Sequence, residues 1–341
     1  MLENGTDRVL RLGVMGCADI AIRRMLPALA EASSVRLTAV ASRSAEKAGR
    51  VAARFGCVAV HGYQRLLERE DVNAVYMPLP PGLRHPWAAA ALAAGKHVLA
   101  EKPLSVSYGE VADLVERARR QRLVLAENFM FLHHSQHAAV ADMIEQGAIG
   151  RIQVLGASFG VPPLDPGSYR YRPELGGGAL LDLGVYPLRA AALVLGGDLE
   201  VLGASLRVDS STGVDVAGSA LLCRADGVPA QLDFGFQHGY RSTYSVWGSE
   251  GRLTVTRAFT PPAQHRPVVR LQQQSRTTEI RLEPDDQVRN SLLAFARAVR
   301  TGVGRSALED NMLNQARLVE EVRKVAKTVH VDDPRREGDQ A

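Results

Sequence analysis

Residues suited to proton transfer occur at two places in this sequence of 341 residues. The first follows a short apolar stretch, His97–Ala100, which predicts a strand and leads into Glu101, Lys102 and Pro103. The carboxyl end of a strand is where an α/β protein holds reactive groups at the mouth of a crevice. Proline fixes the backbone around Lys102, because it lacks an N–H and restricts the residue before it. Lys102 is therefore a candidate catalytic lysine, and a solvated Lys-Pro turn is the alternative.

The second place is a predicted helix that follows the glycine run Gly176–Gly178, which we interpret as a flexible lead-in. Asp182 and Tyr186 lie at positions i and i+4 and so share one face of this helix. A tyrosine has a pKa of about 10 and donates a proton well only where its phenolate is stabilised. A nearby lysine such as Lys102 would do this through charge and hydrogen bonding. The alternatives are a buried aromatic ring for Tyr186 and a helix-surface acid for Asp182.

The N-terminal region carries a variant of the dinucleotide fingerprint G-x-G-x-x-G/A. Val9–Met15 predicts a strand, and a helical pattern begins near Arg23. Between them, Gly16 permits a tight turn, and Ala21 lets helix and strand pack closely. Ala18, at the second glycine position, is small enough for backbone N–H groups to approach a pyrophosphate. The nucleotide-binding candidates in this turn are Gly16, Cys17, Ala18, Asp19 and Ile20.

The end of the next predicted strand indicates which dinucleotide is bound. Val35–Ala41 leads into Ser42 and Arg43, where an NAD-specific domain would place an acid on the ribose 2′-hydroxyl. A hydroxyl and a guanidinium instead suit a 2′-phosphate. Lys47, one helical turn further on, adds positive charge. The pattern favours NADP(H) over NAD(H), and three solvated surface residues are the alternative.

Further motifs follow in order along the chain. They are Tyr76-Met77-Pro78-Leu79-Pro80 with Leu83 and His85, then Gly95-Lys96-His97-Val98, Glu101-Lys102-Pro103, and the run 176–186. With the glycine-containing turn, they resemble the glucose-fructose oxidoreductase/inositol dehydrogenase (Gfo/Idh/MocA) family over nearly the whole chain. Within that family, the run 127–137 is similar to the TDP-3-ketosugar C-3 ketoreductases of antibiotic deoxysugar biosynthesis.

This resemblance implies reduction of the C-3 keto group of a TDP-linked keto-deoxysugar, with hydride from NADPH and a proton from Tyr186. Many family members carry histidine where this chain has Tyr186. Lys102 would polarise the carbonyl or orient Tyr186, and Asp182 would orient Lys102 or a substrate hydroxyl. The resemblance also implies cofactor contacts from Leu79, Pro80, Leu83, His85, Glu101, Lys102 and Asn128, with Asn128 near the nicotinamide or the substrate. The stereochemistry of the hydroxyl formed and the choice between C-3 and neighbouring carbonyls stay open.

A polar loop before the glycine run is a candidate for substrate binding. Tyr169, Arg170, Tyr171 and Arg172 offer two rings and two guanidinium groups. Such groups suit a thymine base and a diphosphate. A solvated loop is the alternative.

The order of predicted elements indicates two domains. Short apolar strands alternate with helices up to Phe131, which predicts an α/β Rossmann-type domain with a parallel sheet over residues 1–131. After Gly150 strands predominate, and 231–237 alternates as in an antiparallel sheet. We expect an α+β domain over 132–331 with a large, open, mainly antiparallel sheet, with helices at 286–300 and 310–328, and a disordered tail over 332–341. By the resemblance, the outer face of this sheet forms a homodimer or homotetramer.

Composition excludes several other classes. The net charge of +4 is dispersed, without the basic clusters typical of nucleic-acid binding. No run of about 18 apolar residues or apolar leader predicts a membrane span or signal segment, so we expect a cytoplasmic protein. Three cysteines far apart do not predict disulfides or a zinc site. His133, His134 and His137 lack companion ligands, so no metal is expected.

Two other functions stay open on the sequence alone. One is an NADP-dependent dehydrogenase of a free sugar, an inositol or a trans-dihydrodiol. The other is a non-enzymatic NADP sensor on the same fold. The presence together of Lys102, Asp182 and Tyr186 argues against the sensor, which needs none of them.

Overall fold

The computed structural model describes residues 9–332 and divides this part of the chain into two compact units. The first comprises residues up to His133 together with Gln287–Leu313, and the second His134–Asp286 with the residues from Asn314 onward. The sequence places the helix at 286–300 in the second domain. In the structure it is α8 (Gln287–Thr301) of the first unit, because its apolar face joins the core around the first strand and helix. The expected disordered tail lies outside the described residues, except for its first residue, Asp332.

The first unit contains a six-stranded, fully parallel sheet in the order β3-β2-β1-β4-β5-β6. Its strands are β1 (Leu10–Met15), β2 (Val35–Ser42), β3 (Val58–His61), β4 (Ala74–Met77), β5 (His97–Glu101) and β6 (Leu125–Asn128). The central strands are mostly apolar and almost wholly buried, as expected for a sheet covered on both faces. This confirms the expected Rossmann-type sheet.

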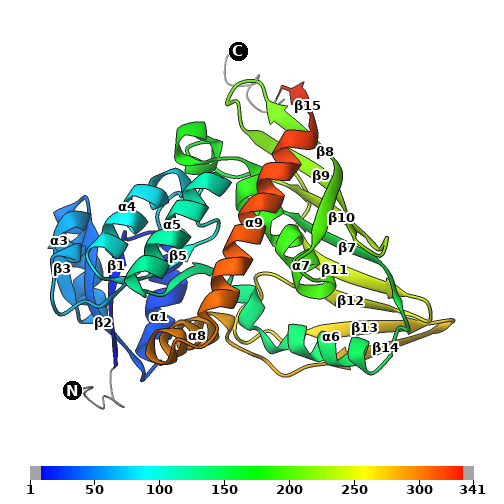
Figure 1. Cartoon of the computed structure of the whole chain (residues 1–341), viewed down its shortest axis with the longest axis horizontal. Coiled ribbons are helices and arrows are strands. Elements are labelled where there is room, and N and C mark those ends of the chain that lie inside the picture. Colours follow the sequence, from blue (N-terminus) through cyan, green and yellow to red (C-terminus); the bar gives the residue numbers. More distant parts are fainter. Residues whose placement is uncertain (1–8, 333–341) are drawn as a thin grey trace. The chain divides into compact units, whose positions relative to one another are not determined.

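Helices cover this sheet. They are η1 (Ala21–Met25), α1 (Leu26–Ala30), α2 (Ala45–Phe55), α3 (Tyr63–Leu67), α4 (Pro81–Ala93), α5 (Tyr108–Gln121), η2 (Met130–His133) and α8. In Figure 1, α4 and α5 lie side by side. Helix α4 begins at Pro81, because proline at the first helical position has the required φ and needs no hydrogen-bond acceptor. The elements α2, β3 and α3 were not predicted from the sequence.

The second unit contains a nine-stranded sheet in the order β14-β13-β12-β11-β7-β10-β9-β8-β15. Its strands are β7 (Ile152–Gly160), β8 (Leu199–Asp209), β9 (Asp215–Arg224), β10 (Pro229–Gly235), β11 (Arg241–Gly248), β12 (Arg252–Thr256), β13 (Val268–Gln273), β14 (Arg276–Arg281) and β15 (Ala326–Val331). Among the described strand pairs of this second sheet, only β7/β10 and β8/β15 are parallel. The mainly antiparallel sheet is therefore confirmed. The helix expected at 310–328 is α9 (Arg305–Val325), and Thr328 lies in β15, paired with Leu206 of β8.

One long apolar helical segment forms the core of the second unit. After the short helices η3 (Tyr169–Tyr171) and η4 (Pro173–Leu175), η5 (Leu180–Gly184) continues directly into α7 (Val185–Leu195). This helix lies against β7 and β10 (Figure 1). Gly184 allows close contact with Phe234 of β10. The stretch Pro173–Leu195 is long and apolar enough to cross a membrane, but 72% of its most apolar window is buried inside the protein. Such burial is typical of a core helix. Helix α6 (Ser135–Glu145) completes the unit.

Candidate active site

Most of the predicted cofactor-binding residues follow adjacent strands of the first sheet. Strands β1, β4, β5 and β6 are neighbours and parallel, so their carboxyl ends form one edge. Gly16, Leu79 and Lys102 follow three of these strands, and Asn128 ends the fourth. The fold therefore brings together residues that are far apart in the sequence at the position where open α/β sheets bind ligands.

The turn after β1 is shaped for close approach of a ligand. Gly16 has φ +112°, and a Cβ there would lie 2.9 Å from the side chain of Leu79. Its N–H donates to Ala41 O at 2.9 Å. The helix that follows has no side-chain cap at its N-terminus. Its first N–H groups are thus suited to bind an anion such as a pyrophosphate. Asp19 forms an exposed ion pair with Arg23.

A buried network fixes Asn128 at the end of β6. Tyr76 Oη and Asn128 Nδ2 both donate to Glu101 Oε1, at 2.8 and 2.9 Å. All three side chains are buried. Among the described residues, nothing donates to Asn128 Oδ1. The network therefore leaves one oriented, buried acceptor at this edge, as a carboxamide N–H₂ of a nicotinamide would require.

The residues expected to select NADP run from the end of β2 into the first turn of α2. Ser42 is buried, and its Oγ accepts from Ser44 N at 3.2 Å, while Ser44 caps α2. Arg43 is exposed and hydrogen-bonds the hydroxyl of Tyr63. Burial raises the pKa of Tyr63, and the nearby Arg43 reduces this rise. Lys47 is exposed in the first turn of the helix. A helix N-terminus with these cations can hold a phosphate group.

Helix α4 positions the loops at this edge through a residue that sequence reasoning missed. Arg84 is buried, its Nε donates to Leu79 O at 2.7 Å, and its NH1 donates to Pro103 O. It therefore connects the loop after β4 to the loop that carries Lys102. His85, expected to line the cofactor, forms a 2.8 Å hydrogen bond to Asp113 of α5. Its contact with the cofactor stays a prediction.

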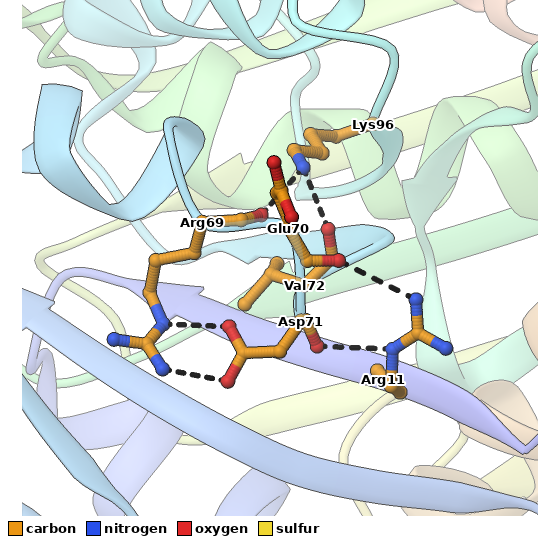
Figure 2. Close-up of polar contacts among 6 residues, drawn as sticks. All are labelled: Arg11, Arg69, Glu70, Asp71, Val72 and Lys96. Atoms are coloured by element: carbon orange, nitrogen blue, oxygen red, sulfur yellow. Dashed lines mark hydrogen bonds and ion pairs between the residues drawn. The ribbon is translucent and has the colours of Figure 1, made fainter.

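The motif around β5 has different roles at its two ends. Lys102 follows the strand, whereas Lys96 precedes it and is buried. Figure 2 shows Lys96 Nζ donating to Arg69 O and Val72 O, both at 2.7 Å. Burial lowers the pKa of Lys96. The Gly-Lys-His part of the motif is thus structural, and it holds the loop before β4.

The helix of the second unit gathers the other catalytic candidates. Arg170 Nε donates to Asp182 Oδ2 at 2.6 Å. Burial disfavours the charged guanidinium, but Asp182, Tyr169 and Tyr186 outweigh this effect and raise the pKa of Arg170. Asp182 is therefore a paired, mostly buried acid, in contrast to the helix-surface alternative. Arg170 is a cation that interacts with Tyr186.

Two aromatic rings hold the ring of Tyr186. Phe159 of β7 contacts it edge-on with centroids 5.0 Å apart, and Phe259 lies 5.5 Å away. Tyr186 itself is only partly buried. The packing fixes the ring while part of the side chain stays accessible, which is what a proton donor needs.

The loop 169–172 divides into residues with different surroundings. Tyr171 is buried with its ring 5.8 Å from Phe236, so this ring is part of the core. Tyr169 lies under the guanidinium of Arg170 at 4.8 Å. Arg172 is exposed and paired with Glu174. Core packing uses the ring of Tyr171, and the predicted contact of this loop with the substrate stays a prediction.

The glycine run is close-packed and was wrongly interpreted as flexible. A Cβ on Gly177 would lie 2.5 Å from Arg170 O, and one on Gly178 would lie 2.2 Å from Asp215 Oδ1. Gly178 also has φ +112°. These glycines are needed for close approach to neighbouring groups.

Two of the three histidines, His134 and His137, are buried and hydrogen-bond neighbouring groups. His137 Nδ1 accepts from Tyr244 Oη at 2.9 Å, and Nε2 donates to Ala258 O at 3.1 Å. His134 is buried and its Nδ1 accepts from Gln136 N. Within residues 9–332 no group of three or more potential ligands is placed to hold a metal ion.

Comparison with known proteins shows the family to which this chain belongs. The family described as an oxidoreductase family with an NAD-binding Rossmann fold matches residues 10–129, and the GFO/IDH/MocA C-terminal domain matches residues 137–254. The chain belongs to the GFO/IDH/MocA oxidoreductase family. The resemblance inferred from the sequence is thereby confirmed, and so is the assignment as an oxidoreductase.

Individual relatives are similar over almost their full length. A dTDP-3,4-didehydro-2,6-dideoxy-alpha-D-glucose 3-reductase of Streptomyces violaceoruber is 52% identical over 96% of this chain and 98% of its own. Its counterpart in Saccharopolyspora spinosa is 51% identical over 92% and 96%. The crystal structure of a 3-ketoreductase from Actinomadura kijaniata with NADP and TDP-benzene is 49% identical, with a TM-score of 0.93 over 94% of this chain and 99% of that one.

Proposed function

We propose that the protein reduces the C-3 keto group of a TDP-linked keto-deoxysugar with NADPH, in deoxysugar biosynthesis. The observation that carries this proposal is the 52% identity, over almost the whole chain, to a relative named as a 3-reductase of such a sugar. The paired Arg170 and Asp182 beside Tyr186 support it, because they suit proton transfer to a developing alkoxide.

The first unit has the features that NADP(H) requires. The uncapped turn at Gly16 would hold the pyrophosphate, and Arg43 and Lys47 the 2′-phosphate. Asn128 Oδ1 would accept from the carboxamide. When bound, the cofactor supplies hydride to the carbonyl carbon. The side chains of this chain then have to orient the carbonyl and move one proton.

In this proposal Tyr186 donates its proton to the carbonyl oxygen as that oxygen gains negative charge. Arg170 stabilises the resulting phenolate, and Asp182 holds Arg170 in place. Lys102 polarises the carbonyl or orients Tyr186. The sequence suggested Lys102 as the main stabiliser of the phenolate, and the structure adds Arg170 as a cation within the same unit as Tyr186.

Recognition of the nucleotide falls to Tyr169 and Arg172. Arg172 is exposed, and its pair with Glu174 is of the kind that contributes about 0–1 kcal/mol, so a diphosphate can compete for it. Tyr169 can stack on a base.

We further infer a cytoplasmic homo-oligomer that forms through the outer face of the second sheet. Leu202, Leu221 and Trp247 are exposed on β8, β9 and β11. Exposed apolar side chains on one sheet mark an association surface. A monomer in light scattering at micromolar concentration would contradict this inference.

The decisive test measures NADPH consumption with TDP-linked keto sugars beside free sugars, inositols and trans-dihydrodiols. Turnover of the nucleotide sugars alone is expected. Preference for a free sugar would favour the dehydrogenase alternative. NADPH binding without turnover of any substrate would favour the sensor.

A further inference from the structure

The helix that carries Asp182 and Tyr186 has no cap of its own. Its N-cap residue is Ala179, which provides no side-chain hydrogen bond. The first N–H groups of a helix have no partner within the helix, so they need an acceptor from elsewhere.

Asp215, the first residue of β9, provides this acceptor. Its Oδ2 accepts from Leu180 N at 2.6 Å, and its carboxylate also hydrogen-bonds the backbone of Ala179. Burial raises the pKa of Asp215, and the hydrogen bond from Leu180 and the charge of Arg323 act against this rise. A negative charge at a helix N-terminus is favourable. Arg323 of α9 interacts electrostatically with the same carboxylate.

The contact between Asp215 and the helix also fixes the preceding loop. Gly178 lies so close to Asp215 that a Cβ would meet Oδ1 at 2.2 Å. The N–H of Gly178 donates to Arg170 O at 2.9 Å, and the side chain of Arg170 reaches back to Asp182. Strand, glycine turn, loop and helix are thus linked through one carboxylate.

We propose that Asp215 is a positioning residue for the reduction, which anchors the first helical turn and thereby sets the geometry of Arg170, Asp182 and Tyr186. This inference rests on the proposed function, because it concerns the residues assigned to proton transfer there. Asp215 acts through these residues and contacts no reacting atom.

The test compares Asp215→Asn with Asp209→Asn as a matched control. Asp209 is a buried acid at the end of β8 that accepts from Ser211 and Thr212 in the β8–β9 turn. Both variants should lower Tm by a few degrees, as loss of a buried hydrogen bond does. Only Asp215→Asn should lower kcat, by about 10-fold or more, with KM for NADPH nearly unchanged. Equal kcat values for the two variants would overturn the proposal.

Hydrogen exchange gives a readout that does not depend on activity. In the wild-type protein the amides of Ala179 and Leu180 should exchange slowly, although they lie at the N-terminus of the helix. Fast exchange at both amides would refute the anchor even if Asp215→Asn failed to fold. If the wild type reduces no TDP-keto sugar, the proposed function fails, while slow exchange still supports the anchor.

Discussion

The pair formed by Arg170 and Asp182 gives a quantitative test of the active-site reasoning. The two groups meet at 2.6 Å with side chains 34% and 13% exposed, between the surface and fully buried cases. Exposed pairs contribute about 0.2–1 kcal/mol, and hydrogen bonds to charged groups about 1.5–3 kcal/mol. We expect a coupling of about 2 kcal/mol in a double-mutant cycle of Arg170→Met and Asp182→Asn.

The assay is urea unfolding of the wild type, both single variants and the double variant. Arg172 and Glu174 form a matched control. Arg172 lies two residues after Arg170, its NH2 is 2.7 Å from Glu174 Oε1, and both side chains are 58% exposed. The cycle of Arg172→Met and Glu174→Gln should give at most about 0.5 kcal/mol of coupling. Additivity of the first pair to within about 0.5 kcal/mol would refute the claim that Arg170 and Asp182 act as a unit.

Catalysis should follow the same pattern. Loss of Asp182 leaves Arg170 without its main orienting partner, so we expect Asp182→Asn to lower kcat by about 10-fold. KM for NADPH should not change, because the expected cofactor contacts lie in the other unit. A change in KM for NADPH alone would contradict this assignment.

Three further predictions concern the cofactor, the proton donor and acid stability. Arg43→Ala should weaken NADPH binding by about 10- to 100-fold and NADH binding little, because a charged hydrogen bond is worth about 1.5–3 kcal/mol; equal losses in titrations would refute the 2′-phosphate contact. Tyr186→Phe should slow hydride-limited reduction by about 10²–10⁴-fold with NADPH affinity kept, whereas near-full turnover would leave Asp182 or His133 as the next candidate donor. Burial lowers the pKa of His137 to about 3. Between pH 6.5 and 3 the unfolded chain therefore binds a proton at this residue that the folded protein does not. The free energy of unfolding then decreases by up to about 1.4 kcal/mol for each unit by which the pH is lowered. His137→Gln should flatten this slope in urea unfolding, and an unchanged slope would exclude His137 as its source.

The first sheet was predictable from the sequence because its central strands are buried on both faces. β1, β4 and β5 are mostly apolar and almost wholly buried. β3 was missed because it is a four-residue edge strand with only Val60 buried. β14 and β15 were missed for the same reason, since they edge the second sheet and are almost wholly exposed. Edge strands lack the burial that creates a hydrophobic period.

The candidate site was predictable where residues follow strands and unpredictable where they pair across the fold. Arg84 had a signal that was overlooked. At helical spacing it shares the buried face of α4 with Pro81, Ala88 and Ala91. His85, the next residue, is not on this buried face. Asp215 had no such signal, because an acid at the start of a strand is typically solvated. Only the fold shows that a helix N-terminus lies against it.

The glycine run shows how the two kinds of information combine. Glycine is compatible both with flexibility and with close approach, and the sequence does not distinguish them. Here Gly177 fits against Arg170 O and Gly178 against the carboxylate of Asp215, so both positions exclude a side chain. The helix of Tyr186 is therefore fixed to the loop on one side and to the sheet on the other. A side chain placed in this way is ordered during folding, and substrate binding energy is not needed to order it.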